Sequence, residues 1–182
     1  MKDFVYYPSL NENKKEEPHY SCIMLNADIK NYIDICKIII DEEDIYDDAD
    51  NEYGYEKQCH ATILYGLHEE DIDKNKLFKD IKSLKPIKCE INKIDIFEND
   101  DYDVVKFNVV VNDELKKYRK LFKDNYPNTQ TFTSFHPHLT IAYLKKGEGK
   151  KYIQKLIEPF EINFNEAVYS DHLYNKKYFK LK

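Results

Sequence analysis

The sequence is poor in arginine and in positive charge. Arg119 is the only arginine, and the 34 acidic residues outnumber the 28 basic ones, which gives a formal net charge of −6. Proteins that grip long nucleic acids neutralise many phosphates with lysine and arginine, usually from a basic stripe. This composition therefore argues against a long nucleic acid as the partner.

Long hydrophobic runs are also missing. No segment approaches the roughly 18 consecutive apolar residues that a membrane-spanning helix needs. Residues 1–20 are polar and charged and contain no apolar stretch of the kind that a signal peptide carries. We therefore expect no membrane partner and a cytoplasmic location.

Cysteine is scarce and carries no metal or redox signature. The four cysteines are too far apart in the sequence for the two-residue spacing of a zinc ribbon or a thiol redox motif; they are Cys22, Cys36, Cys59 and Cys89. Three of them fall on predicted core faces, where cysteine behaves as a small hydrophobe. We expect buried free thiols, no disulfide framework, no metal site and no cofactor.

The chain is long enough for one domain with a real core. We expect a flexible tail over residues 1–18 and a single domain over residues 19–182. The apolar periodicity predicts the following elements: strands at 20–26, 58–65, 87–97, 103–111 and 138–144, helices after Asn26, at 74–84, after Asn112 and near 150–157, and a final hairpin.

These elements occur in an order that repeats. Strand, helix, long loop, histidine-containing strand, helix and strand occur once before residue 98 and again after residue 103. The repeat predicts an α+β fold of two pseudo-symmetric lobes around a cleft, each an antiparallel sheet backed by helices. The long loops at 41–57 and 125–135 lead directly into the two histidine strands. Loops of this length in a compact domain are often lids or binding loops, and these two could gate the cleft.

Both histidine strands carry the pattern His-x-Thr. The first reads His60-Ala-Thr62-Ile-Leu-Tyr and the second His138-Leu-Thr140-Ile-Ala-Tyr. Because side chains alternate faces along a strand, each histidine should share a face with its threonine. Regular alternation also places Leu64 and Ala142 on that face, and Tyr65 and Tyr143 on the apolar face.

Chance placement does not account for two such pairs. Six histidines and five threonines placed at random among 182 residues would give about 0.16 His-x-Thr pairs. Two are present, and both lie in segments with the apolar pattern of a strand. Cleavage of a phosphodiester needs a base for the attacking oxygen and an acid for the leaving oxygen, and histidine can serve as either near neutral pH. Threonine hydroxyls can donate to the phosphate oxygens as charge develops. We therefore predict that His60, Thr62, His138 and Thr140 form a catalytic centre.

This paired pattern resembles the two-histidine (2H) phosphoesterase superfamily, which includes RNA 2′,3′-cyclic phosphodiesterases and LigT-like 2′,5′-RNA ligases. The match covers roughly residues 20–170. The stretches HATILYGL, IFENDDYDVVKFNV and FHPHLTIAYLKKGEGKKY are most similar to phage-encoded anti-CBASS nucleases. The resemblance implies a bilobal fold, metal-independent hydrolysis by the four residues above, and cyclic di- or trinucleotide messengers as substrates in viral counter-defence.

Two other functions stay open. The same four residues occur in enzymes that open RNA 2′,3′-cyclic phosphates or cut 2′,5′ links. A non-catalytic module that sequesters nucleotides is a second alternative. The acidic balance disfavours the RNA-processing function when the substrate is a long RNA; a small nucleotide or a short oligonucleotide end fits the composition better.

Further residues are candidates for substrate binding. Tyrosines near the predicted cleft loops could stack on bases; these are Tyr20, Tyr102 and Tyr126. Lys145 and Lys146 follow the second motif and precede a predicted helix start, a setting that suits a phosphate.

Overall fold

A computed structural model describes residues 20–46, 53–130, 134–153, 155 and 157–182. The expected tail at residues 1–18 lies outside the described residues. The elements run in the order β1 (Tyr20–Ala27), α1 (Tyr32–Ile39), β2 (His60–His68), α2 (Lys74–Lys82), β3 (Ile87–Glu98), β4 (Tyr102–Val109), α3 (Asp113–Asn125), β5 (His138–Lys145), α4 (Lys150–Ile153), β6 (Phe160–Ser170) and β7 (Lys176–Lys180).

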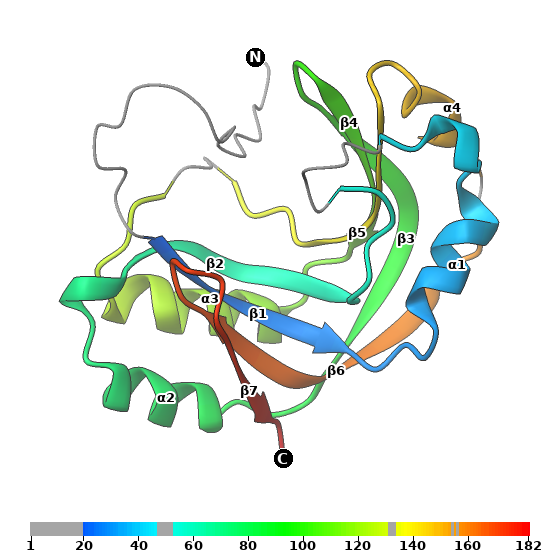
Figure 1. Ribbon diagram of the computed structural model, residues 1–182. Helices are drawn as coiled ribbons and strands as arrows, with labels where there is room; N and C mark the ends of the chain where they lie inside the picture. Colours follow the sequence, from blue (N-terminus) through cyan, green and yellow to red (C-terminus); the bar gives the residue numbers. More distant parts are fainter. Residues whose placement is uncertain (1–19, 47–52, 131–133, 154, 156) are drawn as a thin grey trace, which may run out of the picture.

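The strands form one antiparallel sheet in the order β2-β1-β6-β3-β4-β5, with β7 paired to β6. The two halves of the sheet, which the sequence analysis expected as two lobes, are joined through β3 and β6. The histidine strands β2 and β5 stand at opposite ends of this order, and yet they contact each other (Figure 1). The sheet is therefore curved strongly enough to bring its ends together, and the predicted α+β fold is confirmed.

Helix boundaries follow from local capping. The Asp73 side chain accepts hydrogen bonds from the first turn of α2, and the Asn112 side chain accepts one from the Leu115 amide at the start of α3. Both residues are preferred N-caps because they satisfy amides that have no partner within the helix. The helix expected near 150–157 is shorter, since α4 ends at Ile153.

Strand β2 continues past Gly66, where the sequence analysis expected it to end. Gly66 has φ +88°, a left-handed conformation that favours glycine. A Cβ at this position would lie 2.1 Å from the Thr129 carbonyl oxygen, and the Thr129 amide donates to the Gly66 carbonyl at 2.8 Å. Glycine therefore lets the segment around Thr129 run directly beside β2.

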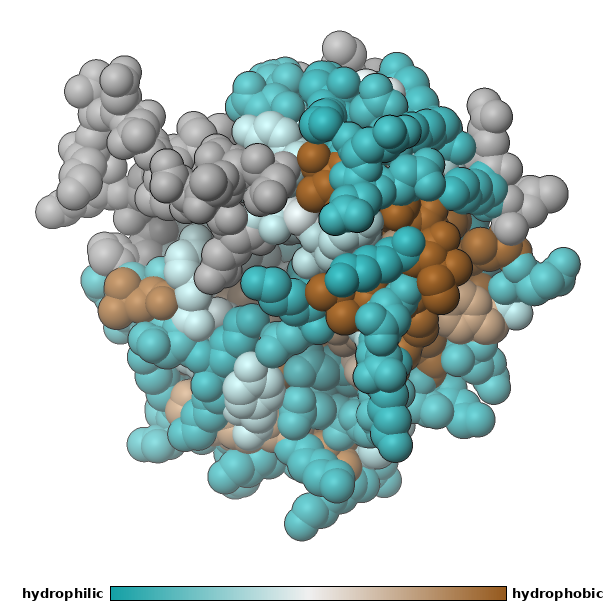
Figure 2. Space-filling model, turned by 45° about the vertical axis from the view of Figure 1, so that its right-hand side comes forward, coloured by the Kyte–Doolittle hydropathy of each residue, from teal (hydrophilic) through white to brown (hydrophobic). Residues whose placement is uncertain are grey.

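Some large hydrophobic side chains are exposed on the surface of the molecule. Figure 2 turns forward the side that carries α1 and α4 and shows a hydrophobic area on a mostly hydrophilic face. The exposed large hydrophobics of these two helices include Ile35, Ile38 and Ile153. No helix in the described part of the chain is both long and apolar enough to cross a bilayer.

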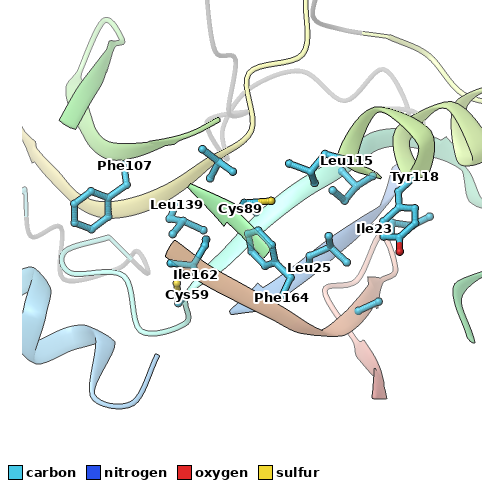
Figure 3. Close-up of a cluster of buried hydrophobic side chains, with 14 of the residues drawn as sticks. Ile23, Leu25, Cys59, Cys89, Phe107, Leu115, Tyr118, Leu139, Ile162 and Phe164 are labelled. Atoms are coloured by element: carbon cyan, nitrogen blue, oxygen red, sulfur yellow. The ribbon is translucent and has the colours of Figure 1, made fainter. Parts of the chain in front are cut away.

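The main core lies on one face of the sheet and is covered by helices (Figure 3). Cys36, Cys59 and Cys89 are buried, and all four thiols are free, as predicted. Burial raises the pKa of Cys36 and of Cys59 to about 12, so these thiols are protonated near neutral pH. They act as small apolar side chains in the core.

Each of the two long loops lies against the histidine strand of the other half of the chain. The segment that precedes β2 lies against β5, where the Tyr143 amide donates to the Gly54 carbonyl and the Glu56 amide to the Ile141 carbonyl. The segment that precedes β5 lies against β2 through Thr129 and Pro127. Each long loop therefore completes the edge of the histidine strand in the other half.

Candidate active site

His60 and His138 occupy equivalent positions, as the first residues of β2 and β5. Nδ1 of His60 lies 3.0 Å from the Gln58 carbonyl oxygen, and Nδ1 of His138 lies 2.9 Å from the His136 carbonyl oxygen. A carbonyl only accepts, so Nδ1 carries the hydrogen in each ring. Nε2 is therefore the nitrogen that can exchange a proton with a substrate.

The threonines follow two residues later on the same strands. Thr140 is buried and Thr62 is half-buried. The Tyr32 hydroxyl of α1 donates a 2.6 Å hydrogen bond to the Thr140 carbonyl oxygen. A helix from the first half of the chain thus holds the catalytic strand of the second half.

A one-residue bulge follows each threonine. The strand register skips Ile63 in β2 and Ile141 in β5. Such a bulge reverses the alternation of side chains beyond it. We call the sheet face that bears the two His-x-Thr motifs the catalytic face; it is opposite to the main core.

Because of the bulges, the side chains beyond each threonine lie on the face opposite to the one that regular alternation predicts. Leu64 and Ala142 are fully buried in the main core and do not share the face of the histidines. Tyr65 is 41% exposed, and Tyr143 is half-buried and outside the core cluster. Both tyrosines are therefore placed on the catalytic face.

Two tyrosine groups border the catalytic face at equivalent positions. Tyr20 contacts Tyr65, with ring centroids 6.0 Å apart. In the other half, Tyr102, which is buried, contacts Tyr143 at 5.7 Å. Tyr20 and Tyr102 were selected from the sequence, whereas Tyr65 and Tyr143 were missed because the bulges leave no mark in the sequence alternation.

The residues that pair with the two histidines are both asparagines, whereas the residues that pair with the two threonines differ. Asn26 pairs with His60, and Asn108 pairs with His138. Met24 pairs with Thr62, whereas Lys106 pairs with Thr140. Lys106 thus adds a positive charge to the second motif only.

Lys106 is almost completely buried, at 3% exposure. Its ammonium lies 3.7 Å from the Asp95 carboxylate and 4.2 Å from the centroid of the Phe97 ring. The Phe97 ring also contacts the His138 ring at 4.9 Å in an edge-on arrangement. This group has no signature in the sequence, because β3 and β4 are remote in sequence from the second motif.

His138 is held in its neutral form. Its pKa is lowered from 6.5 to about 4, first by burial and then by the electrostatic influence of Lys106, His60 and His136; the hydrogen bond to the His136 carbonyl opposes this. The influence of His60 places the two histidines within electrostatic reach of each other. At neutral pH the His138 Nε2 is a free base.

The remaining predicted binding residues have internal partners. Tyr126 is buried in the core, where its hydroxyl donates to Asp80 at 2.6 Å. The Lys145 ammonium donates to the Glu43 carbonyl, and the Lys146 ammonium pairs with Asp103. Asp103 also accepts from the Gly147 and Gly149 amides. The structure therefore does not bring Tyr126 to the catalytic face, and it gives both lysines roles in holding local structure.

A hollow of about 710 Å³ lies beside the start of β2. Its lining includes Asn26 and Gln58, which are neighbours of His60, together with Glu166 and Tyr178.

Within the described residues no group of three or more His, Cys, Asp or Glu side chains is arranged to hold a metal ion.

The curved antiparallel sheet and the two equivalent His-x-Thr motifs define a two-histidine phosphoesterase. The chain belongs to the 2′-5′ RNA ligase superfamily, whose family model matches residues 49–172. It is accordingly an enzyme that acts on phosphodiester bonds.

Several solved structures are similar to this chain, and two of them show the extent of the similarity. One is a crystal structure of a phosphoesterase, with 15% sequence identity and a TM-score of 0.44. The other is LigT of Escherichia coli complexed with 3′-AMP, with 16% identity and a TM-score of 0.45. Each comparison covers 91% of this chain and 96% of the other. A comparison with curated proteins gave no match.

Proposed function

We propose that this enzyme hydrolyses a phosphodiester bond in a cyclic di- or trinucleotide. The observation that carries the proposal is the equivalent placement of Tyr20 with Tyr65 and of Tyr102 with Tyr143 in the two halves of the catalytic face. Aromatic rings stack on bases without needing a particular sequence. Of these rings Tyr102 alone is buried, and in its half Tyr143 is the accessible ring. A phosphate between the two motifs would then have a base-stacking residue in each half, which suits a linkage between two nucleosides.

Catalysis divides between the two histidines. The Nε2 of one histidine takes the proton of the attacking hydroxyl, which is a 2′-hydroxyl of the substrate or a water molecule. As the new P–O bond forms, the Nε2–H of the other histidine gives its proton to the leaving oxygen and the old P–O bond breaks. The Thr62 and Thr140 hydroxyls donate to the non-bridging oxygens as their charge increases.

The scarcity of available positive charge supports a small substrate. The single arginine is engaged within the fold, since Arg119 donates to the Ile63 carbonyl at 2.8 Å and to Gln130 at 2.6 Å. It is not available for a cationic track along the surface. Together with the net charge of −6, this favours a ligand with few phosphates over an extended RNA.

The sequence stretches that resemble phage-encoded nucleases support a role in counter-defence. In this role the enzyme acts in the host cytoplasm and destroys cyclic oligonucleotide signals. The family model supports a second candidate, the processing of RNA ends by opening 2′,3′-cyclic phosphates or cutting 2′,5′ links. Intact histidines and threonines in both motifs argue against a binding module without catalysis.

The test is incubation with a panel of cyclic di- and trinucleotides and with a short RNA that ends in a 2′,3′-cyclic phosphate. Products are separated by chromatography and identified by mass spectrometry, with His138→Ala as the matched control. Attack by water gives a linear product heavier by one water. Attack by a 2′-hydroxyl gives a linear product of unchanged mass that ends in a cyclic phosphate.

The outcomes separate the three functions. Cleavage of a cyclic oligonucleotide by the wild type and not by His138→Ala supports the proposal. Reaction of the RNA end alone would replace it with the end-processing function. Tight binding without any product would indicate the binding module.

A further inference from the structure

The two halves of the catalytic face differ in charge. In the first half, strand pairing aligns His60 with Asn26 and Asn26 with Glu166, whose carboxylate accepts a 2.9 Å hydrogen bond from the Asn26 side chain. In the second half, Lys106 stands opposite Thr140. Directly opposed residues have Cβ atoms about 4.5–5.5 Å apart. The Lys106 ammonium also lies over the Phe97 ring that contacts His138, and it acts electrostatically on His138. The motif of His60 instead has a methionine opposite it and, further away, a carboxylate.

The ion pair of Lys106 is incomplete. Its distance of 3.7 Å to the Asp95 carboxylate exceeds that of a hydrogen bond. Asp95 also pairs with the Lys93 ammonium at 2.9 Å and accepts from the Ile96 amide at 2.9 Å. A buried ammonium is costly unless its donors are used, and a phosphate oxygen beside Thr140 would use them.

On the basis of the proposed function, we propose that Lys106 binds a non-bridging oxygen of the scissile phosphate together with Thr140 and makes the two histidines unequal. His138 is then the base, and His60 is the acid. The Nε2 of His138 accepts the proton of the attacking hydroxyl as the new P–O bond forms. The Nε2–H of His60 protonates the leaving oxygen as the old P–O bond breaks.

The surroundings of His138 agree with the role of a base. The charged and titratable groups that act on it are Lys106 of β4, His60 of β2 and His136 of the preceding loop. Asp95 of β3 acts on Lys106. All three direct influences disfavour the protonated ring, and burial acts in the same direction. A general base must enter the reaction unprotonated, which is the form that these groups favour.

The test compares three variants. Lys106→Met removes the charge and reproduces the methionine that stands opposite Thr62, while Asp95 keeps Lys93 as a partner. Lys106→Arg keeps the charge. The matched control is Lys93→Met, because Lys93 shares Asp95 with Lys106 but its side chain is 57% exposed. Thermal unfolding shows whether each variant is folded.

We expect Lys106→Met to lower kcat/KM by about 10²-fold, the scale of one lost transition-state donor. The acid limb of its pH profile should move to higher pH, because loss of a neighbouring cation raises the pKa of His138. Lys106→Arg should lose less activity, and Lys93→Met should behave like the wild type. A folded Lys106→Met variant that matches Lys93→Met in both rate and pH profile would overturn the proposal.

A second measurement does not depend on turnover. NMR titration of the His138 ring should give a higher pKa in Lys106→Met than in Lys93→Met, and inorganic phosphate should shift the Lys106 side-chain signals of the wild type. If no nucleotide is cleaved by the wild type, the proposed function fails, and these titrations still decide the role of Lys106. An unchanged His138 titration together with unshifted Lys106 signals would refute that role. If Lys106→Met does not fold, Lys106→Arg and the phosphate titration provide the test.

Discussion

The Tyr32 hydroxyl donates a 2.6 Å hydrogen bond to the backbone carbonyl of Thr140, 108 residues further along the chain. Both groups are buried. Replacing Tyr32 by phenylalanine removes the donor and keeps the ring. We expect the free energy of unfolding to fall by about 1–3 kcal/mol, since a buried acceptor loses its partner. Denaturant unfolding of the wild type and the variant measures this; equal stability would contradict it.

The four motif residues should differ in their contributions to turnover. Loss of a general acid or base costs about 10²–10⁴-fold, so we expect losses of that size for His60→Ala and for His138→Ala. The double variant should lose less than the product of the two, because both act in one step. Thr62→Val and Thr140→Val should each cost roughly 10- to 100-fold through lost donors.

Steady-state kinetics and thermal melting together check these values. The side chains belong to the catalytic face, so all four single variants should remain folded. Normal turnover in His138→Ala would remove the central role of the second motif.

His138 should make the fold less stable in mild acid. Its pKa is about 4 in the folded protein, lowered chiefly by burial, against 6.5 in the unfolded chain. Between these values the unfolded chain binds the proton and the folded protein does not. The free energy of unfolding should therefore fall as the pH is lowered from about 6.5 to about 4.

Denaturant unfolding across this pH range measures the effect, and His138→Gln is the control. The variant should show a shallower decline than the wild type. Equal slopes would mean that His138 titrates alike in both states.

Activity should survive excess EDTA. The proposed chemistry takes its acid and its base from His60 and His138 and its phosphate donors from the two threonines, so no step requires a divalent ion. The check is the initial rate of cyclic dinucleotide cleavage before and after chelation. Complete loss, with recovery on addition of a divalent ion, would refute this prediction.

Salt should distinguish a small substrate from a long one. A cyclic di- or trinucleotide offers two or three phosphates, so we expect kcat/KM to change only modestly between about 50 and 200 mM salt. A binder of extended RNA with 6–10 phosphate contacts would lose roughly 10³–10⁵ in affinity over that range. Long single-stranded RNA should react poorly at every salt concentration. If long RNA is the better substrate, the messenger-hydrolase function is wrong.

Local features of the sequence were sufficient to locate the motifs. Apolar alternation marked the strands that carry His60 and His138, and the caps at Asp73 and Asn112 marked the starts of two helices. These predictions succeeded because strand periodicity and helix capping depend on residues only a few positions apart. The repeated order of elements likewise indicated two related halves.

Tertiary structure decided what surrounds the motifs. The bulges at Ile63 and Ile141 move Tyr65 and Tyr143 to the catalytic face, and they arise from pairing with neighbouring strands. The pairing of β4 with β5 places Lys106 opposite Thr140, although the two residues are more than 30 positions apart in the sequence. The crossing of the long loops likewise depends on how the curved sheet brings its two ends together.

The sequence by itself thus determined the four side chains that we propose as catalytic, because each histidine and its threonine are neighbours on one strand. Only the folded chain decided that the two pairs are unequal. A charge acts over distances in space and not along the sequence, so the influence of Lys106 on His138 exists only once β4 and β5 are paired.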